Sequence, residues 1–206
     1  MEKPKNKCDE SRAGARRQQI LDAAGRCFRE HGFHSASMQL IARTAGMSVG
    51  HIYHYFENKE AIIAAIVAAD DVVTRSRFEG FRREPNVSAA MVEQADKGLD
   101  RCLDIDRSAL LMEIAAESGR NPRIAEIVHA TDRGLRQQLE ELMDRVQEEL
   151  RPGTPVDPAR RTAQATLICS LFDGLRMRSI RSPDLAGERD EVLALLRPVL
   201  RRILEG

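Results

Sequence analysis

Residues 37–60 read SMQLIARTAGMSVGHIYHYFENKE, and they predict two short helices joined by a tight turn. The hydroxyl of Ser37 can accept a backbone N–H at the start of the first helix, and Ser48 can do the same for the second. Between them, Gly46 tolerates the positive φ that a tight bend between helices needs. The stretch therefore predicts a helix-turn-helix unit.

The second of these helices separates apolar from polar residues. Val49, Ile52 and Phe56 recur at helical spacing and can be buried, which leaves mainly His and Tyr side chains to face outward. Such side chains suit phosphate oxygens and base edges, and Lys59 adds a positive charge. The pattern favours a DNA-reading helix, although an ordinary helical hairpin with a polar surface is the alternative that these residues leave open.

The preceding residues 16–33, RRQQILDAAGRCFREHGF, predict a further helix that stops near Gly32. Its apolar stripe consists of Ile20, Leu21, Ala24, Cys27 and Phe28. The whole stretch 16–62 resembles the DNA-binding domain of the TetR family of transcriptional regulators, through ILDAAGRCF, GF, IARTAGMS, GHIYHYF and NKEAI in that order. The resemblance implies an all-α protein of about nine helices, with an N-terminal three-helix DNA-binding domain and a C-terminal ligand-binding and dimerisation domain.

The resemblance also implies a set of DNA-binding residues. They are Ser37, Gln39, Ser48, Val49, Gly50, His51, Tyr53, His54, Tyr55 and Lys59. Tyr53 and Lys59 stand where the family contacts phosphates, and Gln39 stands where some members read a base. Two positions depart from the family pattern. Val49 replaces a frequent Lys or Arg, and Ala36 replaces a common hydroxyl residue, so we expect Ser37 to anchor this end of the helix alone.

Composition and charge agree with a helical cytoplasmic protein. The chain has 206 residues and no Trp. Residues 1–60 contain ten Lys/Arg against seven Asp/Glu, and this positive net charge favours DNA binding by the N-terminal part. The N-terminus shows no signal peptide, and the apolar run 61–69 is too short to span a membrane. The cysteines at 8, 27, 102 and 169 are widely separated, and the pairs His31/His34 and His51/His54 lack further ligands, so no metal or cofactor is predicted.

Beyond the DNA-binding segment the pattern predicts helices over about 59–83, 88–104, 107–120, 122–150, 158–180 and 187–204. Pro198 lies inside the last of these, so we expect a kink or a division there. We expect three parts: a flexible tail over 1–11, the DNA-binding domain over 12–58, and the ligand-binding and dimerisation domain over 59–206.

The resemblance implies that the last two long helices form a dimer interface. The sequence permits this, since both helices carry more apolar surface than one buried stripe requires. The candidate interface residues are Ala165, Ile168, Cys169, Phe172, Leu195, Leu196, Val199 and Ile203. The alternative is that both stripes pack inside the monomer.

A ligand pocket is expected among the helices of the C-terminal domain. The candidate residues are Phe78, Phe81, Leu99, Cys102, Met112, Glu113, Leu135, Phe172 and Arg176. The alternative is that most of them are ordinary core, since apolar stripes at helical spacing are usual in helical proteins.

The resulting hypothesis is a homodimeric repressor that binds double-stranded operator DNA and is released by a small-molecule effector of mainly apolar character. The alternative is a ligand-independent activator or architectural protein whose C-terminal domain only dimerises. The sequence contains no Gly-rich phosphate loop, nucleophile elbow or catalytic Cys/His arrangement, so no enzyme is predicted.

Overall fold

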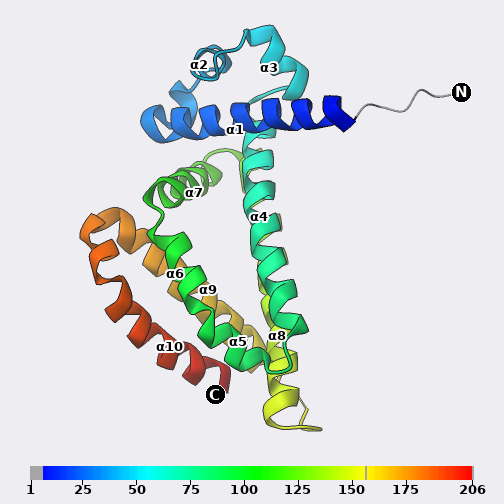
Figure 1. Cartoon of the computed structure of the whole chain (residues 1–206), viewed down its shortest axis with the longest axis vertical. Coiled ribbons are helices and arrows are strands. Elements are labelled where there is room, and N and C mark those ends of the chain that lie inside the picture. The colour runs from blue at the N-terminus through cyan, green and yellow to red at the C-terminus, as the bar shows by residue number, and fades with distance from the viewer. Residues whose placement is uncertain (1–6, 156, 206) are drawn as a thin grey trace, which may run out of the picture. The chain divides into compact units, whose positions relative to one another are not determined.

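The computed structural model describes residues 7–155 and 157–205, and every regular element in these ranges is a helix. The elements are α1 (Lys7–Ser35), α2 (Met38–Thr44), α3 (Val49–Tyr55), α4 (Lys59–Arg83), α5 (Val87–Glu93), α6 (Ala95–Leu103), α7 (Ile105–Ser118), α8 (Pro122–Leu150), α9 (Pro158–Arg181), the 3-10 helix η1 (Pro183–Glu188) and α10 (Arg189–Glu205) (Figure 1). The predicted all-α fold class is confirmed. None of the described helices combines the length and apolar character that crossing a bilayer demands.

The described residues form two compact units. The N-terminal unit comprises residues up to 69 together with 113–128, and the C-terminal unit comprises 70–112 together with 129–205. This differs from the expected boundary before residue 59, because the start of α4 and the segment 113–128 both make contacts with the end of α1 or with each other. The expected tail also differs, since α1 already begins at Lys7, and residues 1–6 of that tail lie outside the described residues.

In the N-terminal unit, α2 and α3 both lie along one side of α1 (Figure 1). The predicted apolar stripe of α1 is buried from Ile20 to Phe28, α1 packs against α2, and α2 packs against α3. Near the end of α1, Gly32 has a φ of 72° and interrupts the helix, which agrees with the predicted stop. This packing gives the short helices α2 and α3 a rigid support, which seven-residue helices need because they are unstable alone.

The turn between α2 and α3 has the predicted geometry. Gly46 adopts a φ of 64°, and the backbone N–H of Met47 donates to the carbonyl of Ala42 at 2.9 Å. The side chains of Ser37 and Ser48 cap the two helices, accepting from the backbone N–H groups of Leu40 and His51 at 3.1 and 3.2 Å. The turn and both caps therefore fix the direction of α3.

Replacing Gly46 with alanine should destabilise the protein by about 1 kcal/mol, because a residue with a Cβ is less stable by about that amount in the left-handed conformation. A Cβ at Gly46 would meet no atom within 4 Å, so the cost is conformational. Gly50 is the matched control, because it is helical and equally open, and its replacement by alanine should stabilise by about 0.5–1 kcal/mol. Urea unfolding of both variants checks this, and equal stabilities would contradict the assigned strain.

In the C-terminal unit, α9 packs against α6 and α10, and α10 also packs against α5 and α6. The buried core of this unit consists of Phe78, Phe81, Val87, Ala90, Met91, Val92, Ala95, Leu99, Leu139, Leu142, Met143, Val146, Ala165, Ile168, Leu193, Leu196, Leu200 and Leu204. At Gly98 of α6, an added Cβ would stand 2.6 Å from the ring of Phe172 of α9. The absence of a side chain at this position therefore lets α6 and α9 approach closely.

The predicted helices 59–83 and 122–150 are confirmed by α4 and α8. The predicted helix 88–104 is wrong, because the chain bends at Gln94 and forms α5 and α6 instead. The predicted helix 187–204 starts later, since residues 183–188 form η1. The expected division at Pro198 does not occur, and α10 runs from Arg189 to Glu205 with the proline inside it.

Candidate nucleic-acid interface

The polar face of α3 is exposed to solvent. Of the predicted DNA-binding residues, those that are exposed are Ser37, Gln39, Ser48, Gly50, His51, Tyr53 and His54. Tyr53 is 53% exposed, which is high for an aromatic side chain, whereas Val49, Tyr55 and Lys59 are half-buried. The structure therefore brings the residues of α3 together on one surface, with Ser37 and Gln39 at the start of α2.

The aromatic side chains of α3 support one another. The ring of Tyr55 lies edge-on to the rings of His51 and His54, with both pairs of ring centroids 5.4 Å apart. Such edge-to-face contacts restrict the rotamers of the two histidines. Tyr55 therefore helps to orient His51 and His54 on the exposed face of α3.

On its buried side, α3 is fixed by apolar contacts. Ile52 and Phe56 are buried, and the guanidinium of Arg17 lies 4.9 Å from the centroid of the Phe56 ring. The amide of Gln19 also donates to the carbonyl of Ala45 at 2.7 Å, which ties α1 to the turn. Because α3 is already held in place in the free protein, little conformational entropy would be lost when its exposed face binds a partner.

Lys59 makes contacts within the chain in addition to the phosphate contact that its position predicts. Its ammonium donates to the carbonyl of Phe33 and to that of His34 at 3.4 Å, and lies 4.2 Å from the centroid of the Phe33 ring. Burial lowers the pKa of Lys59 below its usual value. Because an ammonium has three N–H groups, one remains for a phosphate. Lys59 therefore joins the start of α4 to the end of α1.

Two carboxylates of α7 complete the N-terminal unit, and sequence reasoning missed their role. Glu113 accepts from the backbone N–H of Phe33 at 3.1 Å. Glu117 is only 1% exposed and pairs with Arg120 at 3.1 Å and with His34 at 3.4 Å. Glu113 was predicted to line a ligand pocket, and that role stays a prediction; in the structure its carboxylate bonds to the end of α1 in the N-terminal unit. The spacing of four residues between Glu113 and Glu117, which places both on one face of α7, was the only sequence feature that could have indicated a shared role.

The other predicted ligand residues belong to the C-terminal unit, except that Met112 is the last residue before the chain returns to the N-terminal unit. Phe78, Phe81, Leu99 and Cys102 are buried, and Leu135 and Phe172 pack partly buried against the same core. Arg176 pairs with Asp173 at 2.6 Å. These apolar side chains contribute to the packing of the unit, which was the alternative interpretation.

The predicted dimer residues fall into two groups. Ala165, Ile168 and Leu196 are buried in the unit's own core within the single chain, which favours for these three the alternative that the stripes pack inside the monomer. Cys169, Phe172 and Ile203 are half-buried. Leu195 and Val199 are exposed, and so are two residues of α9 that the sequence did not single out, Leu167 and Met177. The exposed group provides the free apolar surface on α9 and α10.

Known proteins match both parts of the chain. Residues 20–66 match the family described as bacterial regulatory proteins, tetR family, and residues 88–205 match the family described as BetI-type transcriptional repressor, C-terminal. The structure of GusR from Salmonella enterica superposes with a TM-score of 0.75, at 30% identity, over 93% of this chain and 96% of that chain. The protein belongs to the TetR family.

Two curated relatives are also regulators by name. UidR of Escherichia coli, a transcriptional regulator of the HTH type, is 39% identical over 111 residues, which cover 53% of this chain and 55% of UidR. The matching part thus spans about half the length of that relative. The transcriptional repressor AcnR of Corynebacterium glutamicum is 26% identical over 190 residues, which cover 90% of this chain and 93% of AcnR.

Proposed function

We propose that the protein is a DNA-binding transcriptional regulator that acts as a homodimeric repressor and leaves its operator when a small molecule binds. The observation that carries the proposal is the exposed polar face of α3, capped at Ser48 and supported on its other side by buried Ile52 and Phe56. This is the arrangement in which a recognition helix enters a major groove. The function requires no catalytic chemistry and belongs in the cytoplasm, where operator DNA is found.

Free apolar surface on α9 and α10 supports the homodimer. Leu195 and Val199 lie one turn apart on α10 and are exposed in the single chain, as is Leu167 on α9. Neighbouring exposed apolar side chains of this size mark an association surface more often than a solvated one. A dimer presents two copies of α3, so it can bind two half-sites at once and has a higher affinity for DNA than a monomer bound to one half-site.

Helices that belong to both units support release by a ligand. α4 and α8 each contribute their first part to the N-terminal unit and the remainder to the C-terminal unit, and α7 is divided in the opposite order. Two proteins of the same fold are named as small-molecule complexes, FadR of Bacillus subtilis with stearoyl-CoA and SmeT with triclosan. The proposed effector is largely apolar and prefers the state that does not bind DNA, because only differential affinity shifts such an equilibrium. A ligand-independent regulator is the alternative, and unchanged operator affinity with bound effector would favour it.

Substitutions on α3 test the proposed DNA contacts. Tyr53→Phe should weaken binding to all DNA sequences by about tenfold, because it removes one phosphate hydrogen bond. His51→Ala should instead lose about 1–3 kcal/mol at one base pair of each half-site and leave other positions unaffected. Gel-shift titrations against operator variants separate the two effects. His31→Ala is the matched control, since His31 is exposed on α1 and should leave affinity unchanged. A uniform loss for His51→Ala would assign it to the phosphates.

A further inference from the structure

Four arginines from four helices converge in the C-terminal unit. Arg77 lies on α4, Arg101 on α6, Arg107 on α7 and Arg176 on α9, and we call these residues the arginine cluster. Each is at most half-exposed. Arginines are seldom grouped away from solvent unless anions compensate their charge. The partners of each guanidinium therefore show which members of the cluster are already paired and which can bind a further anion.

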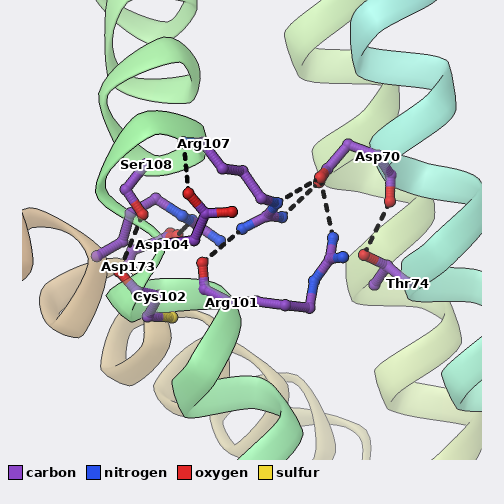
Figure 2. Close-up of polar contacts among 9 residues, drawn as sticks. Asp70, Thr74, Arg101, Cys102, Asp104, Arg107, Ser108 and Asp173 are labelled. Carbon is purple, nitrogen blue, oxygen red and sulfur yellow. Dashed lines mark hydrogen bonds and ion pairs between the residues drawn. The ribbon is translucent and has the colours of Figure 1, made fainter. Parts of the chain in front are cut away.

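One carboxylate, Asp70 of α4, serves two members of the cluster. Arg107 holds it in a bidentate pair, with its Nε 2.7 Å from one oxygen and its Nη2 2.7 Å from the other. Arg101 donates to the first oxygen at 2.9 Å, and both guanidiniums reach Asp70 from the same side (Figure 2). Arg107 also donates to the carbonyl of Arg101 at 3.0 Å. Arg107 is therefore satisfied by the protein itself.

The other three arginines keep unused donors. Within the described residues Arg77 makes no hydrogen bond or ion pair, and its buried Nε has no partner. The guanidinium carbon of Arg77 lies 6.0 Å from the centroid of the Phe81 ring, and the Asp96 carboxylate, whose Oδ1 is also buried without a hydrogen-bond partner, attracts Arg77 without forming an ion pair. Arg176 pairs with Asp173 through one nitrogen, while its buried Nε is also unpartnered. Buried charged donors without partners are costly, so the unpartnered Nε groups of Arg77 and Arg176 call for a further acceptor.

The thiol of Cys102, which interacts electrostatically with all four arginines, does not supply that acceptor. Cys102 is buried, and its Sγ lies 3.4 Å from the carbonyl of Phe172, to which the thiol donates. Burial raises the pKa of Cys102, so the group is a neutral thiol at pH 7. Burial, and then repulsion between the guanidiniums, lowers the pKa of both Arg77 and Arg101. The cluster is therefore a place where positive charge is poorly compensated.

We propose that the arginine cluster is the subsite for an anionic group, a carboxylate or a phosphate, on the small-molecule effector. The guanidinium fork matches both groups, because each presents two acceptor oxygens at the spacing of two N–H donors. The proposal rests on the proposed function and adds a chemical class to it. The effector is an acid with an apolar body, and its charged end binds Arg77, Arg101 and Arg176.

The position of Asp70 provides a route by which a bound anion changes the contacts of α4. Asp70 is the first α4 residue of the C-terminal unit, directly after Ala69 of the N-terminal unit. An arriving anion competes with its carboxylate for Arg101 and Arg107, which hold α4 to α6 and α7. Ligand binding thereby changes the contacts of a helix that both units share.

Inorganic phosphate is the probe for the subsite, and sodium chloride at the same ionic strength is its reference. The thermal midpoint of the full chain is measured against phosphate concentration for the wild type and four variants. Arg77→Gln removes a guanidinium that makes no hydrogen bond, and Arg75→Gln is its control, since Arg75 is exposed on the same helix and pairs with Asp71. Asp70→Asn removes the internal competitor, and Asp71→Asn is the control for that change.

We expect a saturable rise of the midpoint in the wild type, with apparent affinity about tenfold weaker in Arg77→Gln and about tenfold tighter in Asp70→Asn. The two control variants should follow the wild type. A rise that is equal in all five proteins would reflect general salting-out by phosphate and would overturn the proposal, as would no rise beyond chloride. Arg77→Gln is expected to fold in any event, because it breaks no hydrogen bond.

Operator binding is measured separately on the same proteins. Saturable phosphate binding that responds to Arg77→Gln and Asp70→Asn supports the subsite whatever the operator assay shows. Failure of the wild type to bind any operator would overturn the proposed function and not the anion site. The two proposals can therefore fail independently.

Discussion

Replacing Leu195 with glutamate should leave the chain folded and convert the proposed dimer into a monomer. Leu195 is 72% exposed in the single chain, so the substitution disturbs no core packing. In a dimer the new carboxylate would be buried without a partner, which costs about 3–5 kcal/mol, or more than a hundredfold in the dimerisation constant. Sedimentation equilibrium measures the change directly, and operator affinity should fall in parallel because a monomer reaches one half-site.

The control for this experiment is Val72→Glu. Val72 is 64% exposed on α4, away from the proposed interface on α9 and α10, so this variant should remain dimeric and bind operator normally. An intact dimer for Leu195→Glu would show that α10 does not form the interface. Dissociation of both variants would place the interface on α4 as well.

Replacing Ile168 with glutamate should have a different outcome, namely loss of the folded C-terminal unit. Ile168 is 5% exposed and belongs to the core of α9, α10 and their neighbours. An unpaired carboxylate at such a position costs about 3–5 kcal/mol of folding free energy, a large share of the stability of a domain this size. Urea unfolding followed by circular dichroism should show the loss at any protein concentration.

Leu167 is the matched control for Ile168, since it is the preceding residue of α9 and is 55% exposed. Leu167→Glu should retain wild-type unfolding of the monomer and affect only association. If Ile168→Glu instead unfolds like the wild type and dissociates, Ile168 faces a partner and its assignment to the monomer core is wrong.

These two neighbours illustrate what sequence can and cannot resolve. The apolar stripe of α9 predicts a long amphipathic helix, and the helix is there. Periodicity cannot say which apolar residue faces the chain's own core and which faces outward when a helix has apolar residues on two sides. Ile168 and Leu196 were therefore assigned to an interface although the fold buries them.

The DNA-reading unit could be predicted in more detail because its signals are local. Caps at Ser37 and Ser48 and the positive φ of Gly46 depend on neighbouring backbone alone, and all three are present. The role of Glu113 could not be found in this way. Its partner is the backbone N–H of Phe33, 80 residues earlier, and no local pattern encodes such a contact.

The arginine cluster shows the same limit for the C-terminal unit. Arg176 was predicted as a polar contact of the ligand from its place beside Phe172. Arg77, Arg101 and Arg107 were not singled out, because each looks like an ordinary surface residue in its own helix. Only the fold brings side chains from α4, α6, α7 and α9 to one place.

We propose that α3 reads a specific DNA sequence as half of a two-fold symmetric site. Selection of bound duplexes from a fully randomised DNA library, followed by sequencing, tests it most directly. The wild type should enrich a palindromic sequence whose half-sites lie about 34 Å apart or at a multiple of that spacing, and His51→Ala should relax one base pair in each half. Enrichment of no sequence by the purified, folded wild type would contradict the claim.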